Sequence, residues 1–274
     1  MIILALTNLR SVYFMSDIPG AIFDLHGKVA LITGASGGIG RATAVVFAQQ
    51  GAELILTDRD LAACEQVAAE CDAQGARVTA LAADMSNQSE VETLADRALA
   101  RHGAIDVLVC NAGIQPISPL HEVTAADWDR LMQINLRSAH TLCARFAPEM
   151  GRRGGGAIIL MASITALRGA KGLGLYAMSK AALAQMARNL ALEWGPQGVR
   201  ANALAPGLIR SPMTERFLKD QSFTTRRLAA TPLRRVGEPY EVAGVAAMLA
   251  SAAGGFVSGQ TIVIDGGTLI SDGN

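Results

Sequence analysis

The stretch Lys28-Val-Ala-Leu-Ile-Thr-Gly-Ala-Ser-Gly-Gly-Ile-Gly40 decides the fold of this chain. An apolar run of strand length, residues 29–33, leads directly into a glycine-rich turn, and a helical pattern follows from residue 39. Glycines let a backbone turn tightly and approach a pyrophosphate, whose charge meets free N–H groups and the positive end of the helix. This succession of strand, turn and helix predicts a dinucleotide-binding unit.

The glycine spacing is Gly-x-x-x-Gly-x-Gly, which departs from the common Gly-x-Gly-x-x-Gly fingerprint. Support comes from Asp58, which ends the next apolar run 18 residues after Gly40. A carboxylate at this point accepts hydrogen bonds from the adenosine ribose and repels a 2′-phosphate, so we expect NAD to be preferred. Arg59 follows directly and can serve a 2′-phosphate, which keeps NADP open as a second cofactor.

Strand-length apolar runs alternate with longer amphipathic stretches from residue 28 onward, which is typical of βαβ units and a parallel sheet. Runs such as Val29-Ala-Leu-Ile32 lack polar alternation, so helices should cover both faces of the sheet. The expected fold is a Rossmann-like, doubly wound three-layer α/β sandwich. Thr124 and Asp127 form a capping-box pattern. The expected strands are 29–33, 53–57, 77–82, 105–110, 157–162, 199–205 and 261–264, and the expected helices lie near 39–50, 60–74, 88–102, 124–150, 175–194 and 238–252.

Length and composition favour one catalytic domain over residues 21–274, because 274 residues of which 50% are hydrophobic suit one sizeable core. Residues 1–20 fit no packed element, so we expect a loose tail or a translation start at Met15. No apolar run approaches the about 20 residues that span a bilayer. Twenty-four basic against 24 acidic side chains argue against nucleic acid and favour a small-molecule partner.

The cysteines form no Cys-x-x-Cys pair and the histidines show no close metal-ligand spacing, so we expect no metal and free thiols in a reducing compartment, the cytoplasm. Residues 207–237 combine prolines, arginines and scattered apolar side chains in a connection of unusual length. We interpret this segment as a substrate lid. The alternative is a surface insertion with no role in binding.

Tyr176 and Lys180 stand four residues apart on a predicted helix, so the phenol and the ammonium share one face. A phenol has a pKa of about 10, and a fixed cation nearby favours the phenolate, as a proton-transfer residue requires. Such a pair alone can equally belong to a packed helix face. Here, however, the helix follows a strand whose end carries Ser163, a second hydroxyl for the same chemistry.

The glycine-rich turn also reads as Gly34-x-Ser36-x-Gly38, the nucleophile-elbow pattern of serine hydrolases. That fold needs a histidine late in the chain, after the acid. The last histidine here is His140, near the middle of the sequence. A hydrolase is therefore disfavoured.

Several motifs in order resemble the short-chain dehydrogenase/reductase family, over about residues 27–267. Thr33–Gly40 resembles its cofactor turn, and Cys110-Asn-Ala-Gly113 resembles its Asn-Asn-Ala-Gly segment, with Cys110 as a departure. The remaining matches are Asp84, Asn135, Ser163, Tyr176, Lys180 and the Pro-Gly segment at 206–209, with Ser211 where the family commonly has Thr.

The resemblance implies hydride transfer between a nicotinamide and an alcohol or ketone, and a seven-stranded sheet in the order 3-2-1-4-5-6-7. Ser163 would hold the substrate oxygen, Tyr176 would transfer its proton, Lys180 would bond the nicotinamide ribose and lower the phenol pKa, and Asn135 would support a water relay. The implied cofactor-binding set is Gly34, Ser36, Gly38, Ile39, Gly40, Asp58, Arg59, Asp84, Met85, Asn111, Ala112, Gly113, Tyr176, Lys180, Pro206, Gly207, Ile209 and Ser211.

The substrate pocket is expected to draw on Ser163, Thr165, Gln115, Tyr176, Gly172 and Met213, with Ile114 and Lys171 nearby, a set without a strong charge. The pattern resembles dehydrogenases of sugar acids or polyols and also 3-oxoacyl thioester reductases; Asp58 favours the first group. A dinucleotide-binding sensor without turnover is the alternative from another class. The family also implies a homotetramer, with Ala181, Ala182, Leu183, Met186 and Leu190 as candidate contacts that burial in the monomer explains equally well.

Overall fold

The structure, a computed structural model, describes residues 21–272. The predicted N-terminal tail and the Met15 start lie outside these residues. Seven parallel strands form a single sheet in the order β3-β2-β1-β4-β5-β6-β7, as predicted. The strands are β1 (Val29–Thr33), β2 (Glu53–Asp58), β3 (Val78–Ala82), β4 (Val107–Cys110), β5 (Gly156–Met161), β6 (Val199–Pro206) and β7 (Thr261–Ile264).

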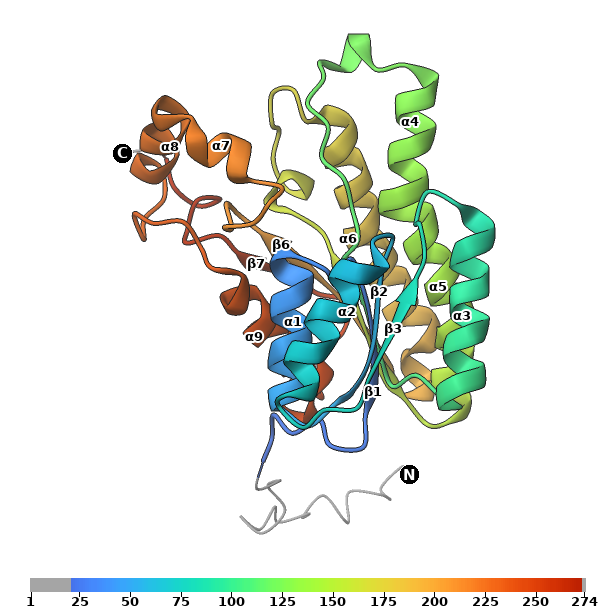
Figure 1. The fold of residues 1–274 in the computed structure, drawn as a ribbon. Helices are drawn as coiled ribbons and strands as arrows, with labels where there is room; N and C mark the ends of the chain where they lie inside the picture. The colour runs from blue at the N-terminus through green and yellow to red at the C-terminus, as the bar shows by residue number, and fades with distance from the viewer. Residues whose placement is uncertain (1–20, 273–274) are drawn as a thin grey trace, which may run out of the picture.

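Helices cover both faces of the sheet, which confirms the three-layer sandwich (Figure 1). Alternate residues of each strand enter opposite cores. Leu31 and Ile55 pack toward α3 and α5, whereas Ile32 and Leu56 pack toward α1 and α9. The helices are α1 (Gly38–Gln49), α2 (Leu61–Asp72), α3 (Gln88–His102), α4 (Ala125–Met132), α5 (Ser138–Arg152), α6 (Gly174–Trp194), α7 (Glu215–Lys219), α8 (Gln221–Ala229) and α9 (Pro239–Ala250).

The predicted single helix over residues 124–150 is wrong in its middle. The Thr124–Asp127 capping box is present, but a π-helical segment, Gln133–Arg137, separates α4 from α5. Asn135 lies in this segment, and its side chain accepts from the Ile114 N–H at 2.8 Å and donates to the Ile114 carbonyl oxygen at 3.0 Å. This widened turn brings a buried amide to the loop after β4, as π-helical turns often do at functional sites.

Residues 207–237, the predicted lid, contain two short helices, α7 and α8, for which the sequence predicted no element. Both lie on the side of the carboxyl ends of β6 and β7 (Figure 1). The chain order reverses between β1 and β4, so the loops after these strands diverge and leave a crevice, where open α/β sheets bind ligands.

Candidate functional site

The glycine-rich turn is fixed by hydrogen bonds between the ends of β1 and β4. The Thr33 hydroxyl accepts from the backbone N–H groups of Asn111 and Ala112, both at 3.0 Å. The Asn111 amide donates to the carbonyl oxygens of Thr33 and Gly34, both at 3.0 Å. A Cβ at Gly40 would lie 2.1 Å from the Gly34 carbonyl oxygen, so only glycine fits where helix and turn meet.

The first turn of α1 suits a phosphate group. Its N-cap residue Gly37 makes no side-chain cap, and no acidic residue occurs in the first turn. Gly38 has a φ of 54°, a conformation that glycine adopts readily. The helix therefore presents uncapped N–H groups and its positive end to the crevice, which fits a dinucleotide pyrophosphate.

Asp58 lies at the end of β2, beside this turn. One carboxylate oxygen accepts from the Ser36 hydroxyl at 2.6 Å, and the other accepts from the Arg59 N–H at 2.8 Å. Hydrogen bonds from Ser86 lower the pKa of the Asp84 carboxyl, and the Arg59 guanidinium contributes in the same direction. The end of the crevice predicted to bind adenosine thus has a fixed carboxylate, with a cation and a second carboxylate nearby.

The predicted catalytic residues meet at the other end of the crevice. Tyr176 and Lys180 lie on the first turns of α6, and Ser163 follows β5. The Lys180 ammonium lies 5.5 Å from the centre of the Tyr176 ring and donates to the Met161 carbonyl oxygen at 2.7 Å. A Cβ at Gly113 would lie 3.3 Å from both Lys180 Nζ and Asn135 Oδ1, so the two side chains flank one glycine.

Burial dominates the acid–base properties of this pair. It raises the pKa of Tyr176 to about 12, while the neighbouring Ser163 hydroxyl acts in the opposite direction. It also lowers the pKa of Lys180 to about 8. The direction for Tyr176 is opposite to the predicted lowering of the phenol pKa by Lys180. In the chain alone, removing the phenolate from water outweighs the hydrogen bond with Ser163, the one contribution that lowers the pKa. Tyr176 is a protonated donor at neutral pH.

A cleft of about 470 Å³ joins the two ends of the crevice. Most predicted site residues line it, whereas Gly40 and Asn135 support its wall from behind, and Thr165 and Gly172 lie outside its lining. The lining also includes residues that the sequence did not single out. The only feature of the sequence that could have identified them is their position next to the matched motifs. The predicted residues that line it are Gly34, Ser36, Gly38, Ile39, Asp58, Arg59, Asp84, Met85, Asn111, Ala112, Gly113, Gln115, Ser163, Tyr176, Lys180, Pro206, Gly207, Ile209, Ser211 and Met213, and the additional ones include Ile134, Met161, Ala162, Pro212 and Thr214.

Other kinds of site find little support in the part of the chain that the structure describes. Residues 21–272 contain no cluster of three or more histidine, cysteine, aspartate or glutamate side chains able to hold a metal ion. No helix in this range has the length and apolar character needed to cross a membrane. The four cysteines are buried thiols, and Cys143 lies beside Cys110, whose hydrogen bond raises the Cys143 pKa.

Comparison with known proteins agrees with this geometry. The family model described as enoyl-(acyl carrier protein) reductase matches residues 34–268. Dehydrogenase/reductase SDR family member 4 of Oryctolagus cuniculus is 36% identical over 89% of this chain and 94% of its own length. Gluconate 5-dehydrogenase of Gluconobacter oxydans is 35% identical, over 91% and 98% respectively. A solved gluconate 5-dehydrogenase from Burkholderia cenocepacia, in complex with NADP and tartrate, superposes with a TM-score of 0.87 at 34% identity, covering 91% of this chain and 98% of that one.

Proposed function

Because this chain belongs to the short-chain dehydrogenase/reductase family of NAD(P)-dependent oxidoreductases, we propose that it interconverts a secondary alcohol and a ketone, with Tyr176 as the proton-transfer residue. The observation that carries the proposal is the convergence of Ser163, Tyr176 and Lys180 on one cleft that also contains the uncapped start of α1. A retained dinucleotide cleft alone would suit a sensor equally well. The buried proton-transfer pair beside it favours catalysis.

The chain's own groups divide the work of ketone reduction. Ser163 orients the substrate oxygen, and Tyr176, which is protonated at neutral pH, donates its proton to that oxygen. A bound nicotinamide supplies the hydride. Lys180 would hold the nicotinamide ribose. It lies beside Asn135, which is hydrogen-bonded to Ile114, and this is the proposed side of proton exchange with solvent. In alcohol oxidation Tyr176 would first release its proton toward solvent past Lys180 and Asn135, and its phenolate would then take the proton of the substrate hydroxyl as the hydride leaves for the nicotinamide.

Nicotinamide absorbance over time tests the proposed function. NAD(P)H oxidation would be followed separately with NADH and NADPH against ketones, oxo sugar acids and 3-oxoacyl thioesters. Turnover of one class supports an alcohol/ketone oxidoreductase. Cofactor binding without turnover of any class would favour the sensor alternative.

Among substrate classes, a sugar acid or polyol is favoured over a 3-oxoacyl thioester. The relative named gluconate 5-dehydrogenase covers nearly the whole chain, and Asp58 stands at the ribose end of the cleft. The 3-oxoacyl thioester reductase remains the alternative, since a relative of that name, from Thermotoga maritima, is 36% identical over 90% of this chain. The four unpaired cysteine thiols support a reducing compartment, and we propose the cytoplasm.

We expect NAD to be preferred over NADP because the negative Asp58 carboxylate would repel the 2′-phosphate of NADP. The hydrogen bond from Ser36 holds this carboxylate in place. Asp58→Ala should shift the ratio of kcat/KM for the two cofactors toward NADP by about 10- to 100-fold. This is the effect expected when one or two repulsive charge contacts are removed. Initial rates with each cofactor at fixed substrate measure the shift. Equal efficiencies in the wild type would contradict the predicted preference, and Asp60→Ala, on the exposed side of the same loop, is the control.

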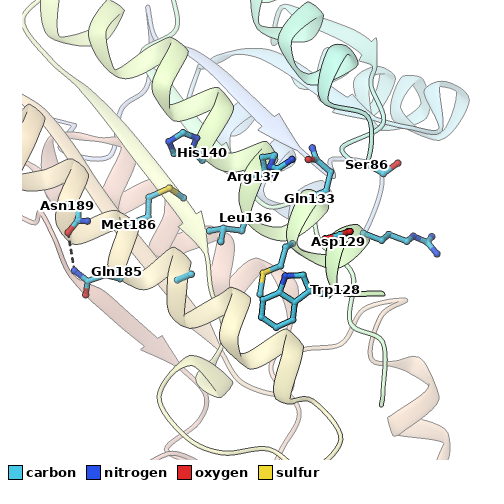
Figure 2. A pocket seen from close by; sticks show the side chains of 13 residues that line it. Ser86, Trp128, Asp129, Gln133, Leu136, Arg137, His140, Gln185, Met186 and Asn189 are labelled. Carbon is cyan, nitrogen blue, oxygen red and sulfur yellow. Dashed lines mark hydrogen bonds between the residues drawn. The ribbon is translucent and has the colours of Figure 1, made fainter. Parts of the chain in front are cut away.

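We also propose a homotetramer that uses the outer face of α4, α5 and α6. A groove of about 1190 Å³ lies there, and Figure 2 shows Trp128, Leu136 and Met186 facing it. Leu183 and Leu190 point into the monomer's own core, so they drop out of the predicted contact set, whereas Ala181, Ala182 and Met186 stay accessible. A second copy would cover Trp128, which is 43% exposed.

Multi-angle light scattering tests this assembly. The expected mass at micromolar concentration is that of four chains, and Trp128→Asp should reduce it to two or one, because a charge would be buried in an apolar contact. Thermal melting at fixed concentration shows whether Trp128→Asp is still folded, and so whether a lower mass reflects loss of the interface alone. A wild-type monomer would contradict the proposal.

A further inference from the structure

The segments on the substrate side of the cleft are strongly basic, although the whole chain is neutral. The loop after β5, residues 163–173, contains Arg168 and Lys171 and no acidic side chain. The lid, residues 207–237, contains six arginines and Lys219 against only Glu215 and Asp220. A concave site lined by one sign of charge concentrates ligands of the opposite sign. These basic segments therefore favour an anion on the substrate side, away from Asp58 and Asp84, the two carboxylates of the cleft lining.

The two acidic side chains of the lid are already engaged. Glu215 lies 2.8 Å from the Lys219 ammonium, and Asp220 caps α8 by accepting from the Phe223 N–H at 3.0 Å. Just beyond the lid, Glu238 and Glu241 pair with Arg210 and Arg235. Within residues 21–272, no carboxylate is found at ion-pair distance from Arg216.

Arg216 connects the lid to the loop after β4. Its Nη2 atom donates to the carbonyl oxygen of Gln115, a residue 101 positions earlier in the chain. Its guanidinium also lies 4.8 Å from the centre of the Phe217 ring, which packs on Phe223 with 5.3 Å between ring centres. These contacts hold a positive group beside Gln115, which itself lines the cleft, and the other N–H donors of Arg216 have no acidic partner among the described residues.

Gln115 lines the same cleft as Ser163 and Tyr176. Its side-chain oxygen is buried and has no hydrogen-bond partner. Buried polar atoms are nearly always hydrogen-bonded, so an orphaned acceptor on a residue that lines this cleft indicates a hydrogen-bond donor supplied by a ligand. A hydroxyl group is the simplest such donor.

We propose that the substrate is a hydroxy or oxo carboxylate, whose carboxylate binds Arg216 and whose further hydroxyl donates to the Gln115 side-chain oxygen. This inference rests on the proposed function and names its substrate class. The guanidinium can hold a carboxylate through two parallel hydrogen bonds. Arg216, which the sequence reasoning did not single out, is then the residue that selects acids over their neutral counterparts.

Substrate pairs, each an acid and a neutral counterpart with the carboxylate replaced or esterified, test the inference. D-gluconate would be compared with D-glucitol, and 3-hydroxybutyrate with its methyl ester, by NADH formation in wild type, Arg216→Gln and Arg226→Gln. We expect the wild type to prefer one acid over its neutral partner. Arg216→Gln should lower kcat/KM for that acid by about 10- to 100-fold, mainly through KM, and leave the neutral partner within about twofold. Arg226 is exposed on α8, so Arg226→Gln controls for the general loss of one positive charge. It should change kcat/KM for the acid and for its neutral partner by less than about threefold.

The outcomes separate this inference from the proposed function. Turnover only of neutral alcohols, or preference for an acetoacetyl thioester in the reverse direction, would keep the oxidoreductase and overturn the carboxylate class. An equal loss for both members of a pair in Arg216→Gln would also overturn it. If neither pair turns over, binding is measured instead, by titrating the protein–NADH complex with gluconate and with glucitol and following NADH fluorescence. Gluconate-specific binding that Arg216→Gln abolishes supports the inference, and binding of neither or of both equally refutes it.

Discussion

Tyr176→Phe is expected to lower kcat by about a thousandfold while the fold and the cofactor affinity stay unchanged. The substitution removes one oxygen from a side chain that is 7% exposed, and the ring keeps its packing against Leu131 and Leu175. What disappears is the proton that burial keeps on the phenol, since its pKa is raised to about 12. Ser163 remains as a hydrogen-bond donor but cannot replace the acid. Initial rates of NAD(P)H oxidation measure the loss.

Two further measurements make this result specific. Thermal melting and NADH fluorescence titration should agree with the wild type, because neither depends on the phenolic oxygen. Tyr240→Phe is the matched control, since this tyrosine is 63% exposed on α9 and lies outside the cleft lining. A Tyr176→Phe enzyme with more than about a tenth of the wild-type kcat would remove Tyr176 from the proton-transfer role.

The sheet was predictable from sequence because each buried strand ends where an apolar run meets a residue of different chemistry. β1 ends at Thr33, directly before Gly34, and β2 ends at Asp58; both ends were predicted within one residue. The π-helical turn was not predictable, since the amphipathic pattern continues through it and the hydrogen bonds between Asn135 and Ile114 that accompany it join residues 21 positions apart.

The candidate site also has some features that were predictable from the sequence and others that were not. Motif order alone places Ser163, Tyr176 and Lys180 at one cleft, because the carboxyl ends of parallel strands share an edge of the sheet. The direction of the Tyr176 pKa was missed because spacing along a helix shows a nearby cation but not the loss of water around the phenol. Arg216 was missed because its partner is the carbonyl oxygen of Gln115, which no side-chain pattern reveals.

Lys180→Met is expected to separate catalysis from stability. The ammonium is only 3% exposed, and its one protein acceptor in the described structure is the Met161 carbonyl oxygen. Removing it should lower kcat/KM by about 100-fold or more, because Tyr176 and the ribose both lose a cation. The same change should stabilise the fold by about 1–3 kcal/mol at pH 7, since a buried charge is replaced by a similar apolar volume. Steady-state kinetics and urea unfolding measure the two effects.

The pH dependence of that stability difference identifies its cause. Burial lowers the Lys180 pKa from 10.5 to about 8. Between these values the unfolded chain binds more protons than the folded one, so wild-type stability rises with pH through the window. Lys180→Met lacks this rise. The gain in its free energy of unfolding over the wild type should therefore be largest below pH 8 and shrink toward pH 10.5. Lys28→Met, at an exposed lysine, should show neither the gain nor the slope. A Lys180→Met protein that is less stable than the wild type at pH 7 would mean that the ammonium is stabilised by more than its bond to Met161, and the buried-charge argument would fail.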